Sequence, residues 1–345
     1  MDNLSGKPQV MKKVNSGLIK QILKEKGSAT KAEISESTGI SATTVRTLLN
    51  QLFKNSEIVS LGFDESSGGR RAEIYALNLN DNLALSFYLR GNNLNYLVVD
   101  PLENVIKDST TPIIEDDFQV IFEDFIDTIL SKYPIKAIGI GVPGVVENGS
   151  YFAGRELSGW EKYNIGEYIE KKYNIPVILE NDLNAAALGF SLNYSKEMNI
   201  SSKNDLNMIY IRFSKNGIGA GIITDGNLIH GESNFAGEIG FIPIGHKGHL
   251  ERILNDDIDD ITYIDLVSQV LAIINCVINP KFIVIGGEKF RNNLTDDIKK
   301  CSNKYMADNI IPEIILSKDS RKDFLTGMAY LTIKLINSNI KLINT

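Results

Sequence analysis

Residues 31–53 (KAEISESTGISATTVRTLLNQLF) constrain the fold of this chain most, because two short helical patterns stand on either side of a glycine. Thr30 and Ser41 directly precede the two patterns and are residue types that cap helix N-termini. Gly39 permits the tight bend between them. The second pattern repeats apolar residues at helical spacing, at Val45, Leu48, Leu49 and Leu52. We therefore predict two packed helices joined by a sharp turn.

The face of the second helix that this packing leaves outside consists of small hydroxyl, amide and arginine side chains. It comprises Ser41, Ala42, Thr43, Thr44, Arg46, Thr47 and Asn50. Arg46 and Thr43 lie near the start of the helix, where a recognition helix contacts base edges in the major groove. The polar side chains of this face are the first predicted DNA contacts.

The flanking sequence completes a winged helix-turn-helix over residues 12–80. Upstream, an apolar helical stripe that Gly27 can terminate runs through Leu18, Ile19, Ile22 and Leu23. Downstream, residues 57–79 read as two strands joined by a Gly/Ser loop with Arg70 and Arg71 at its end. These arginines, beside Gly68 and Gly69, suit a phosphate backbone or a minor groove. The alternative is a three-helix protein-protein adaptor.

Charge divides the chain in the same way. The first 80 residues carry 11 Lys and Arg against 8 Asp and Glu, whereas the remainder carries 25 against 35. Only the N-terminal part favours a polyanion, and its modest excess predicts that two copies bind one DNA site.

Length and composition limit the number of domains and the class of protein. At 345 residues and 43% hydrophobic content, the chain is long enough for a small domain and a larger two-lobed one. No apolar run of about 18 residues occurs, and the N-terminus lacks the apolar stretch of a signal peptide, so we expect a cytoplasmic protein without membrane contact. Cys276 and Cys301 form no CxxC pair and are expected to be buried packing residues.

Residues 81–345 alternate strand and helix patterns, which predicts two α/β lobes. The expected strands are 83–89, 95–100, about 104–109, 136–142, the PVILEND segment, NMIYIRF, GIGAGIIT and KFIVIGG. The expected helices are the segments DDFQVIFEDFIDTILSKY, about 183–192, ITYIDLVSQVLAIINCVI and about 322–336. The lobes are expected at about 81–182 plus the C-terminal helix, and at about 183–320, with polar residues meeting between them.

Four constellations mark the expected cleft. A Pro-Gly turn lies within residues 138–149, and Gly286-Gly287 follows a strand. Glu180-Asn181-Asp182 opens a helix, where a carboxylate can accept a hydroxyl proton and an amide can hold a neighbouring hydroxyl. A helix N-cap by Asn181 or Asp182 is the alternative. Glu238, flanked by glycines, is a candidate ligand or an exposed loop acid.

The order of these pieces resembles the ROK family of repressors, open reading frames and sugar kinases, which has an actin-like, hexokinase-like ATPase fold. The resemblance rests on Gly68-Gly69-Arg70-Arg71 in the wing, VPG at 142–144, ENDLNAAALG at 180–189, GIGAGIITDG at 217–226 and AGEIG at 236–240. It implies that Asp182 matches the family's catalytic base, and that Asn181, Glu238 and Glu251 match residues that contact sugar hydroxyls.

The phosphate motifs of the family are missing. Its Asp-x-Gly-Gly-Thr turn corresponds to LRGNNLN at 89–95, and the second turn, usually Gly-Thr before GIG, reads Lys215-Asn216. Without the Asp to organise Mg²⁺ and the glycines to admit phosphates, we predict no phosphoryl transfer, no catalytic residue and no cofactor. A residual sugar kinase or phosphatase that uses Asp182 is the alternative.

The structural zinc of many family members is also not expected. The histidine of GEIGH is Phe241 here, and the HKGHLE loop at 246–251 has no cysteine. His246 and His249 cannot complete a tetrahedral site by themselves.

The resemblance implies a DNA-binding transcriptional regulator, expected to be a repressor, that acts as a homodimer or tetramer on a pseudo-palindromic operator. The kinase-like domain would bind a sugar or sugar phosphate at the four matched residues. A different metabolite, a protein or no effector at all stays open, and Lys215 and Arg90 are candidates for pairing with an anionic effector.

Overall fold

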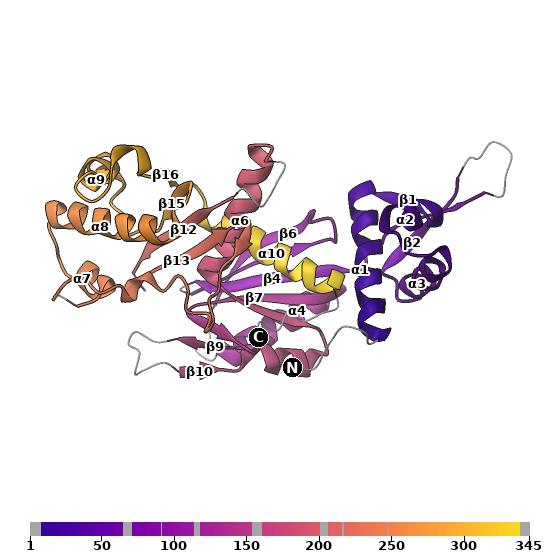
Figure 1. Ribbon diagram of the computed structural model, residues 1–345. Coiled ribbons are helices and arrows are strands. Elements are labelled where there is room, and N and C mark those ends of the chain that lie inside the picture. Colours follow the sequence, from indigo (N-terminus) through magenta and orange to yellow (C-terminus); the bar gives the residue numbers. More distant parts are fainter. Residues whose placement is uncertain are drawn as a thin grey trace. The chain divides into compact units, whose positions relative to one another are not determined.

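The computed structural model describes residues 8–64, 71–90, 92–113, 118–153, 161–200, 206–215, 217–246 and 248–338 (Figure 1). The chain divides into two compact units. The first is built from residues up to 142, residues 148–179 and residues from 329 onward, and the second from residues 143–147 and 180–328. The predicted boundary at residue 80 and the predicted lobe limits remain predictions.

The N-terminal part of the first unit contains three helices and a small sheet with strand order β1-β3-β2. These elements are α1 (Pro8–Lys26), β1 (Ser28–Thr30), α2 (Lys31–Thr38), α3 (Ala42–Lys54), β2 (Ile58–Phe63) and β3 (Glu73–Leu77). Their shared core is formed by the α1 stripe, the inner face of α3 and the strands, and includes Ile19, Leu23, Ile34, Leu49 and Ile58.

Local chemistry fixes the helix boundaries here. Thr30 and Glu33 form a reciprocal capping box at α2, and Gly39 ends that helix with a φ of 69°. The Ser41 side chain accepts a hydrogen bond from the Thr44 amide at the start of α3. The helix-turn-helix between α2 and α3 therefore forms at the residues that the sequence indicates.

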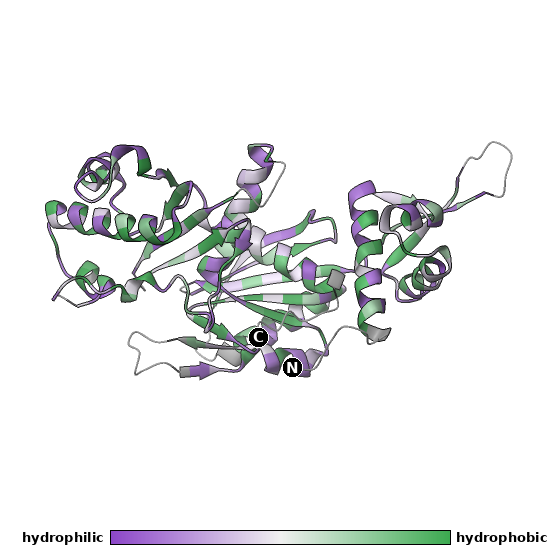
Figure 2. Ribbon diagram, in the orientation of Figure 1, coloured by the Kyte–Doolittle hydropathy of each residue, from purple (hydrophilic) through white to green (hydrophobic). Residues whose placement is uncertain are grey.

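The rest of the first unit is a five-stranded sheet with order β11-β7-β4-β5-β6. Its strands are β4 (Leu83–Arg90), β5 (Asn93–Val99), β6 (Val105–Pro112), β7 (Ile135–Val142) and β11 (Val177–Asn181), and α4 (Phe118–Leu130) and α5 (Ile165–Tyr173) belong to the same region. β4 pairs in parallel with β7 and antiparallel with β5. Much of β4 and β7 is hydrophobic (Figure 2), as expected for strands covered on both faces.

A second, smaller sheet lies outside the sheet of β4. It joins β9 (Ser150–Ala153) to β10 (Glu161–Tyr163), and the sequence analysis did not predict it.

The second unit is built on a sheet with order β14-β13-β12-β15-β16. Its strands are β12 (Met208–Ser214), β13 (Gly217–Thr224), β14 (Asn227–Leu228), β15 (Phe282–Gly286) and β16 (Glu313–Leu316). The helices are α6 (Asp182–Glu197), α7 (Leu250–Asn255), α8 (Asp260–Ile278) and α9 (Thr295–Ser302). One face of β12 packs into a core that α8 shares, including Ile209, Ile211, Phe213, Val267 and Leu271.

The last helix, α10 (Ser320–Ser338), contributes to both units, because its residues up to Met328 belong to the second and those from Ala329 to the first. In the first unit, the Thr332 hydroxyl lies 3.0 Å from that of buried Ser86. In the second, a Cβ on Gly189 of α6 would lie 1.8 Å from the backbone oxygen of Asp323. Glycine is thus required where α6 and α10 meet.

α8 is long and apolar enough to span a membrane by length and composition, and half of its most apolar window is buried in the second unit. Core helices pass the same test. The prediction that both cysteines are buried is wrong: Cys276, on α8, is exposed, and Cys301, on α9, is half-buried. Leu271, Ile274 and Asn275 form the buried side of this part of α8, which turns the Cys276 side chain outward.

Candidate functional site

The start of α6 carries two of the predicted effector residues. Asn181 is the N-cap of this helix, and its Oδ1 accepts hydrogen bonds from the amides of Leu183 (2.9 Å) and Asn184 (3.1 Å). Its Nδ2 donates to the Gly144 carbonyl at 2.9 Å. The capping alternative is therefore realised, and among the described residues the second N–H of Nδ2 has no hydrogen-bond acceptor.

Three predicted carboxylates influence one another electrostatically. Asp182 begins α6, Glu238 precedes a short 3-10 helix (Ile239–Phe241), and Glu251 lies in α7. Burial, and to a smaller extent the negative charges of Asp182 and Glu251, together raise the pKa of Glu238 from 4.5 to about 7. The structure thus brings the three acids together, as a group that can accept hydrogen bonds from several hydroxyls.

Close backbone packing holds this group, and it explains the glycines of the GIGAG and AGEIG segments. A Cβ on Gly221 of β13 would lie 2.4 Å from the Leu183 backbone oxygen in α6. Gly237 has a φ of 97°, and a Cβ there would lie 2.0 Å from the Ala220 backbone oxygen. The Ala220 amide donates to the Gly237 carbonyl at 2.8 Å, which ties the Glu238 loop to β13.

Arg212 of β12 is a site residue that the sequence analysis missed. Its Nη1 lies 3.6 Å from Oδ2 of Asp182, and the two side chains are 15% and 30% exposed. An arginine inside the otherwise apolar strand NMIYIRF was the available signal, because a charge in a buried strand needs a special reason.

His230 and Glu180 form a second feature that the motifs did not predict. Glu180 is 7% exposed, and its Oε1 accepts from the Asn181 amide and from Asn184 Nδ2. Its Oε2 lies 2.9 Å from His230 Nε2, and this hydrogen bond raises the pKa of His230. The pair connects the end of β11 to the loop that leads to Glu238.

Aromatic rings surround Phe241, which replaces the histidine of the family pattern. The Phe241 ring centroid lies 5.6 Å from that of Phe235 and 5.7 Å from that of His249. His249 Nδ1 lies 3.2 Å from the Gly240 carbonyl oxygen. Within the described ranges, no three His, Cys, Asp or Glu side chains are grouped so that they could hold a metal ion.

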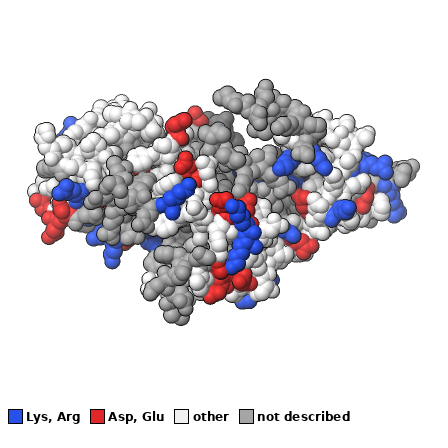
Figure 3. All heavy atoms as spheres, turned by 90° about the horizontal axis from the view of Figure 1, so that it is seen from below, with Lys and Arg blue, Asp and Glu red and all other residues white. Residues whose placement is uncertain are grey.

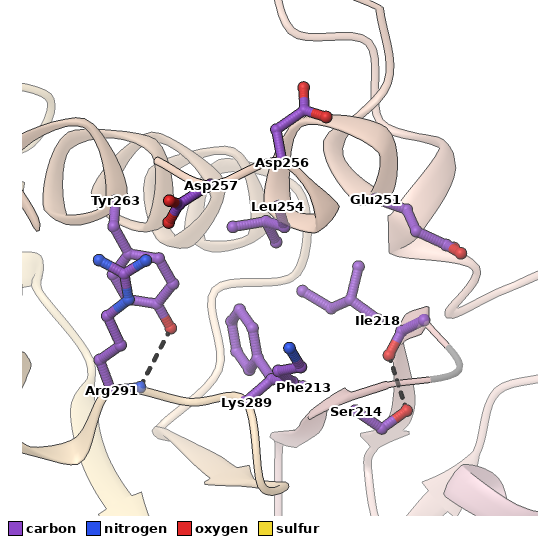
Figure 4. A pocket seen from close by; sticks show the side chains of 11 residues that line it. Phe213, Ser214, Ile218, Glu251, Leu254, Asp256, Asp257, Tyr263, Lys289 and Arg291 are labelled. Carbon is purple, nitrogen blue, oxygen red and sulfur yellow. Dashed lines mark hydrogen bonds between the residues drawn. The ribbon is translucent and has the colours of Figure 1, made fainter. Parts of the chain in front are cut away.

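A cavity of about 330 Å³ adjoins Glu251 (Figure 4). It is lined by Phe213 and Ser214 of β12, by Gly217 and Ile218 of β13, by residues of α7 and the segment after it, and by Tyr263, Lys289 and Arg291. The Arg291 guanidinium lies over the Tyr263 ring and pairs with Asp260 at 2.6 Å. The side chains around this cavity carry both signs of charge, which favours no single ligand class.

The two basic residues at the lost phosphate turns belong to different units, and their pairing with an anionic effector stays a prediction. Arg90 is exposed at the end of β4, where it pairs with Asn93 across the hairpin in the first unit. Lys215 is exposed in the β12–β13 turn of the second unit, and its amide donates to Glu288 Oε1 at 3.1 Å.

The predicted DNA-reading side chains lie on the outer face of α3. All of them are exposed except Thr44, which is half-buried: Ser41, Thr43, Arg46, Thr47 and Asn50. Ser41 and Thr44 are engaged in the helix cap, and the Thr47 hydroxyl donates to the Thr43 carbonyl. Arg46 and Asn50, one helical turn apart, extend from this face with their polar ends exposed.

The wing is described in part. Arg71 precedes β3 and is exposed, whereas Arg70 lies outside the described residues. Figure 3 shows several Lys and Arg side chains at the right-hand end of the molecule, where Figure 1 places α1, α2 and α3.

The winged helix is fastened to the rest of the first unit by lysines of α1. Lys20 is 3% exposed, and its Nζ donates to Glu57 Oε2 and to the Ile336 carbonyl in the last turns of α10, both at 2.9 Å. Lys24 pairs with Glu103 at 2.6 Å.

Comparison with known proteins agrees with this architecture. Residues 91–251 match the model of the ROK family. A xylose repressor from Bacillus subtilis (strain 168) is 32% identical over 247 residues, which are 69% of this chain and 62% of that protein. The match thus spans less than two thirds of the length of this curated relative.

Two solved structures have the same fold. A ROK family transcriptional regulator, described as a homolog of the E. coli MLC protein, covers 96% of this chain and 100% of its own, with 20% identity and a TM-score of 0.68. A ROK family glucokinase from Streptomyces griseus, in complex with glucose and AMPPNP, covers 73% and 99%, with 18% identity and a TM-score of 0.55. The predicted fold class is confirmed, and this chain carries a ROK family domain.

Proposed function

We propose that this protein is a DNA-binding transcriptional repressor whose kinase-like domain binds a sugar-like effector and does not transfer phosphate. The observation that carries the proposal is the winged helix-turn-helix, with its capped α3 and exposed polar face, on the same chain as the carboxylate group around Glu238. The xylose repressor name of the Bacillus subtilis relative supports both halves and makes xylose the first sugar to test.

The DNA half of the proposal rests on α3 and the wing. Arg46 and Asn50 are exposed on the outer face of α3 and can donate to base edges. Arg71 is exposed beside the wing and suits a phosphate or minor-groove contact. The small positive excess of this region favours two copies on a pseudo-palindromic operator, so we propose a homodimer or a tetramer acting in the cytoplasm.

The effector half rests on hydrogen-bonding capacity. Asp182, Glu238 and Glu251 are acceptors for hydroxyl protons, and Asn181 keeps one N–H after capping α6. A polyol or sugar presents hydroxyls in the number and spacing that such a set can bind.

A helical route links the two halves. α6 starts at Asn181 and Asp182, and it contacts α10 so closely that no side chain fits at Gly189. The far end of α10 accepts a hydrogen bond from Lys20 of the winged helix. A ligand that prefers one arrangement of α6 by a hundredfold would supply about 2.7 kcal/mol to shift the DNA-binding equilibrium.

The proposal excludes phosphoryl transfer because the phosphate-holding parts are replaced. The β4–β5 hairpin offers Arg90 and Asn93 in place of an Asp-Gly-Gly turn. Arg212 lies beside Asp182, so the guanidinium competes for the carboxylate that would take a hydroxyl proton. Transfer depends on positioning and charge neutralisation, both of which these changes weaken.

The test is a selection of genomic fragments bound by the purified chain, followed by gel-shift titration with and without sugars, starting with xylose. We expect one fragment class to bind specifically and at least one sugar-like compound to weaken that binding. Absence of any specific fragment at low ionic strength would contradict the proposal.

A residual kinase is the second candidate, favoured by Asp182 in the position of the family's catalytic base. Turnover of Mg-ATP with the same sugar panel tests it. Phosphate transfer at an ordinary metabolic rate, abolished by Asp182→Asn, would replace the regulator proposal.

A further inference from the structure

Arg212 has an unusual environment for a charged side chain. Its side chain is 85% removed from solvent, yet its nearest carboxylate oxygen, on Asp182, lies 3.6 Å from Nη1, which is too far for a hydrogen bond. Nε is fully buried without an acceptor. Across the described ranges, this guanidinium makes no hydrogen bond, although it has five N–H donors.

Such an arginine lacks an acceptor. Burying an ion without hydrogen bonds costs free energy, and one loose ion pair does not offset that cost. The Nη groups, unlike Nε, are not sealed from solvent, so an incoming ligand can reach them. They lie next to Asp182 and therefore at the edge of the carboxylate group that contains Glu238 and Glu251.

The neighbouring strands explain why no side chain fills this role. Arg212 pairs in register with Gly219 on β13 and with Gly286 on β15, neither of which has a side chain. On its own strand the next residue on the same face, Tyr210, directs its hydroxyl to Ser317 and Asp323 instead. Leu183 packs over Gly219, where its Cδ1 would lie 2.6 Å from a Cβ, and its apolar side chain offers the guanidinium no acceptor.

We propose that the effector is a sugar that carries an oxyanion, either the carboxylate of a sugar acid or the phosphate of a sugar phosphate, and that Arg212 binds this group. The inference rests on the effector half of the proposed function. The hydroxyls of the ligand donate to Asp182, Glu238 and Glu251, and Arg212 supplies the donors that a neutral sugar would not fully use. A planar guanidinium binds an oxyanion through two parallel bonds and keeps its other edge for Asp182.

The three acids would repel an anion, and two features oppose that repulsion. Glu238, whose pKa lies at about 7, is protonated in a large fraction of molecules at neutral pH and can donate a hydrogen bond in that form. The positive charge of Arg212, whose Nη1 lies 3.6 Å from Asp182 Oδ2, offsets the negative charge of that carboxylate.

The test compares matched ligands on the full chain by titration calorimetry: xylose, xylonate and xylose 5-phosphate, then glucose, gluconate and glucose 6-phosphate, with inorganic phosphate alone. We expect at least one anionic member to bind tenfold or more tightly than its neutral parent. Preference for the acid or for the phosphate identifies the source of the oxyanion. If inorganic phosphate alone binds as tightly as the sugar phosphates, the result would contradict a sugar effector.

Arg212→Gln should remove the preference for the anionic ligand, and Arg212→Lys should retain part of it, because an ammonium keeps the charge but not the fork. Arg252→Gln, at an exposed position of α7, is the matched control and should leave the preference intact. The inference would be overturned if neutral sugars bound as tightly as their anionic counterparts, or if Arg212→Gln kept the preference for the anionic ligand. Either result would leave the proposed repressor function intact. If the protein binds operator fragments but none of these ligands, the inference and the effector half of the proposed function both fail, and the DNA half remains.

Discussion

Replacing Glu238 by glutamine should stabilise the protein at alkaline pH, because the native fold holds this carboxyl where ionisation is unfavourable. The folded pKa of about 7 lies above the usual 4.5. Because the pKa of Glu238 is raised in the folded state, this carboxyl ionises first in the unfolded chain as pH rises above 4.5. The folded protein therefore loses stability with rising pH until Glu238 also ionises in the folded state, near pH 7. Full ionisation then corresponds to a penalty of about 3 kcal/mol.

The magnitude depends on pH in a defined way. From the same two pKa values, the penalty is about 1 kcal/mol at pH 5.5 and approaches about 3 kcal/mol at pH 8.5. The advantage of Glu238→Gln over the wild type should therefore grow by about 2 kcal/mol between these pH values. For a unit of this size, that is a relative gain in melting temperature of roughly 4–8 °C.

Thermal melting of both proteins across this pH range is the assay. Loss of contacts in the variant adds an offset that does not vary with pH, so the change in the difference is the diagnostic quantity. Glu232→Gln, at an exposed position of the same loop, is the control and should show no such trend. A difference between Glu238→Gln and wild type that stays constant from pH 5.5 to pH 8.5 would refute the reasoning.

Three further predictions concern the DNA contact, the attachment of the winged helix and a histidine pair. Arg46→Ala should weaken operator binding by about 1–3 kcal/mol and relax specificity at one base pair; an equal loss on all sequences in competition gel shifts would argue against base reading. Lys20→Met should destabilise the protein by about 3–5 kcal/mol in denaturant titrations, because it leaves Glu57 unpaired. Lys24→Met, which breaks a more exposed pair, should cost less than about 1 kcal/mol. His230→Gln should remove a stabilisation that the wild type has in full below pH 6.5. The wild type itself loses this stabilisation as pH rises through the raised pKa of His230 in the folded state. If the melting temperatures of both proteins followed the same pH trend, the result would contradict this prediction.

The sequence was sufficient where the structure is set by local chemistry. The cap residues Thr30 and Ser41, and Gly39 with its positive φ, determine the helix-turn-helix by interactions within a few residues. Strands such as β7 and β15 are continuous apolar runs, which are recognisable without knowing their neighbours. These elements follow from short-range patterns.

What the sequence did not reveal depends on residues that are distant along the chain. His230 is 50 positions from Glu180, and Arg212 is 30 from Asp182, so no motif connects either pair. The exposure of Cys276 likewise depends on which face of α8 meets the sheet. An apolar helix of this length gives little periodic signal for that choice.

The glycines at the α6–α10 crossing support the proposal that effector binding at α6 affects the winged helix. A Cβ on Gly327 would lie 1.9 Å from the Ala185 backbone oxygen, and Gly189 is equally restricted on the other helix. Because no flexible side chain separates the two backbones there, we expect a displacement of α6 at Asp182 to move α10 as well. Because α10 continues without interruption to Ile336, and the Ile336 carbonyl accepts a hydrogen bond from the Lys20 side chain, we expect the displacement to reach the winged helix through the backbone of α10 and this lysine. Under the proposed function, loss of the phosphate motifs leaves this route in place, so the domain can report a bound ligand to DNA without transferring phosphate.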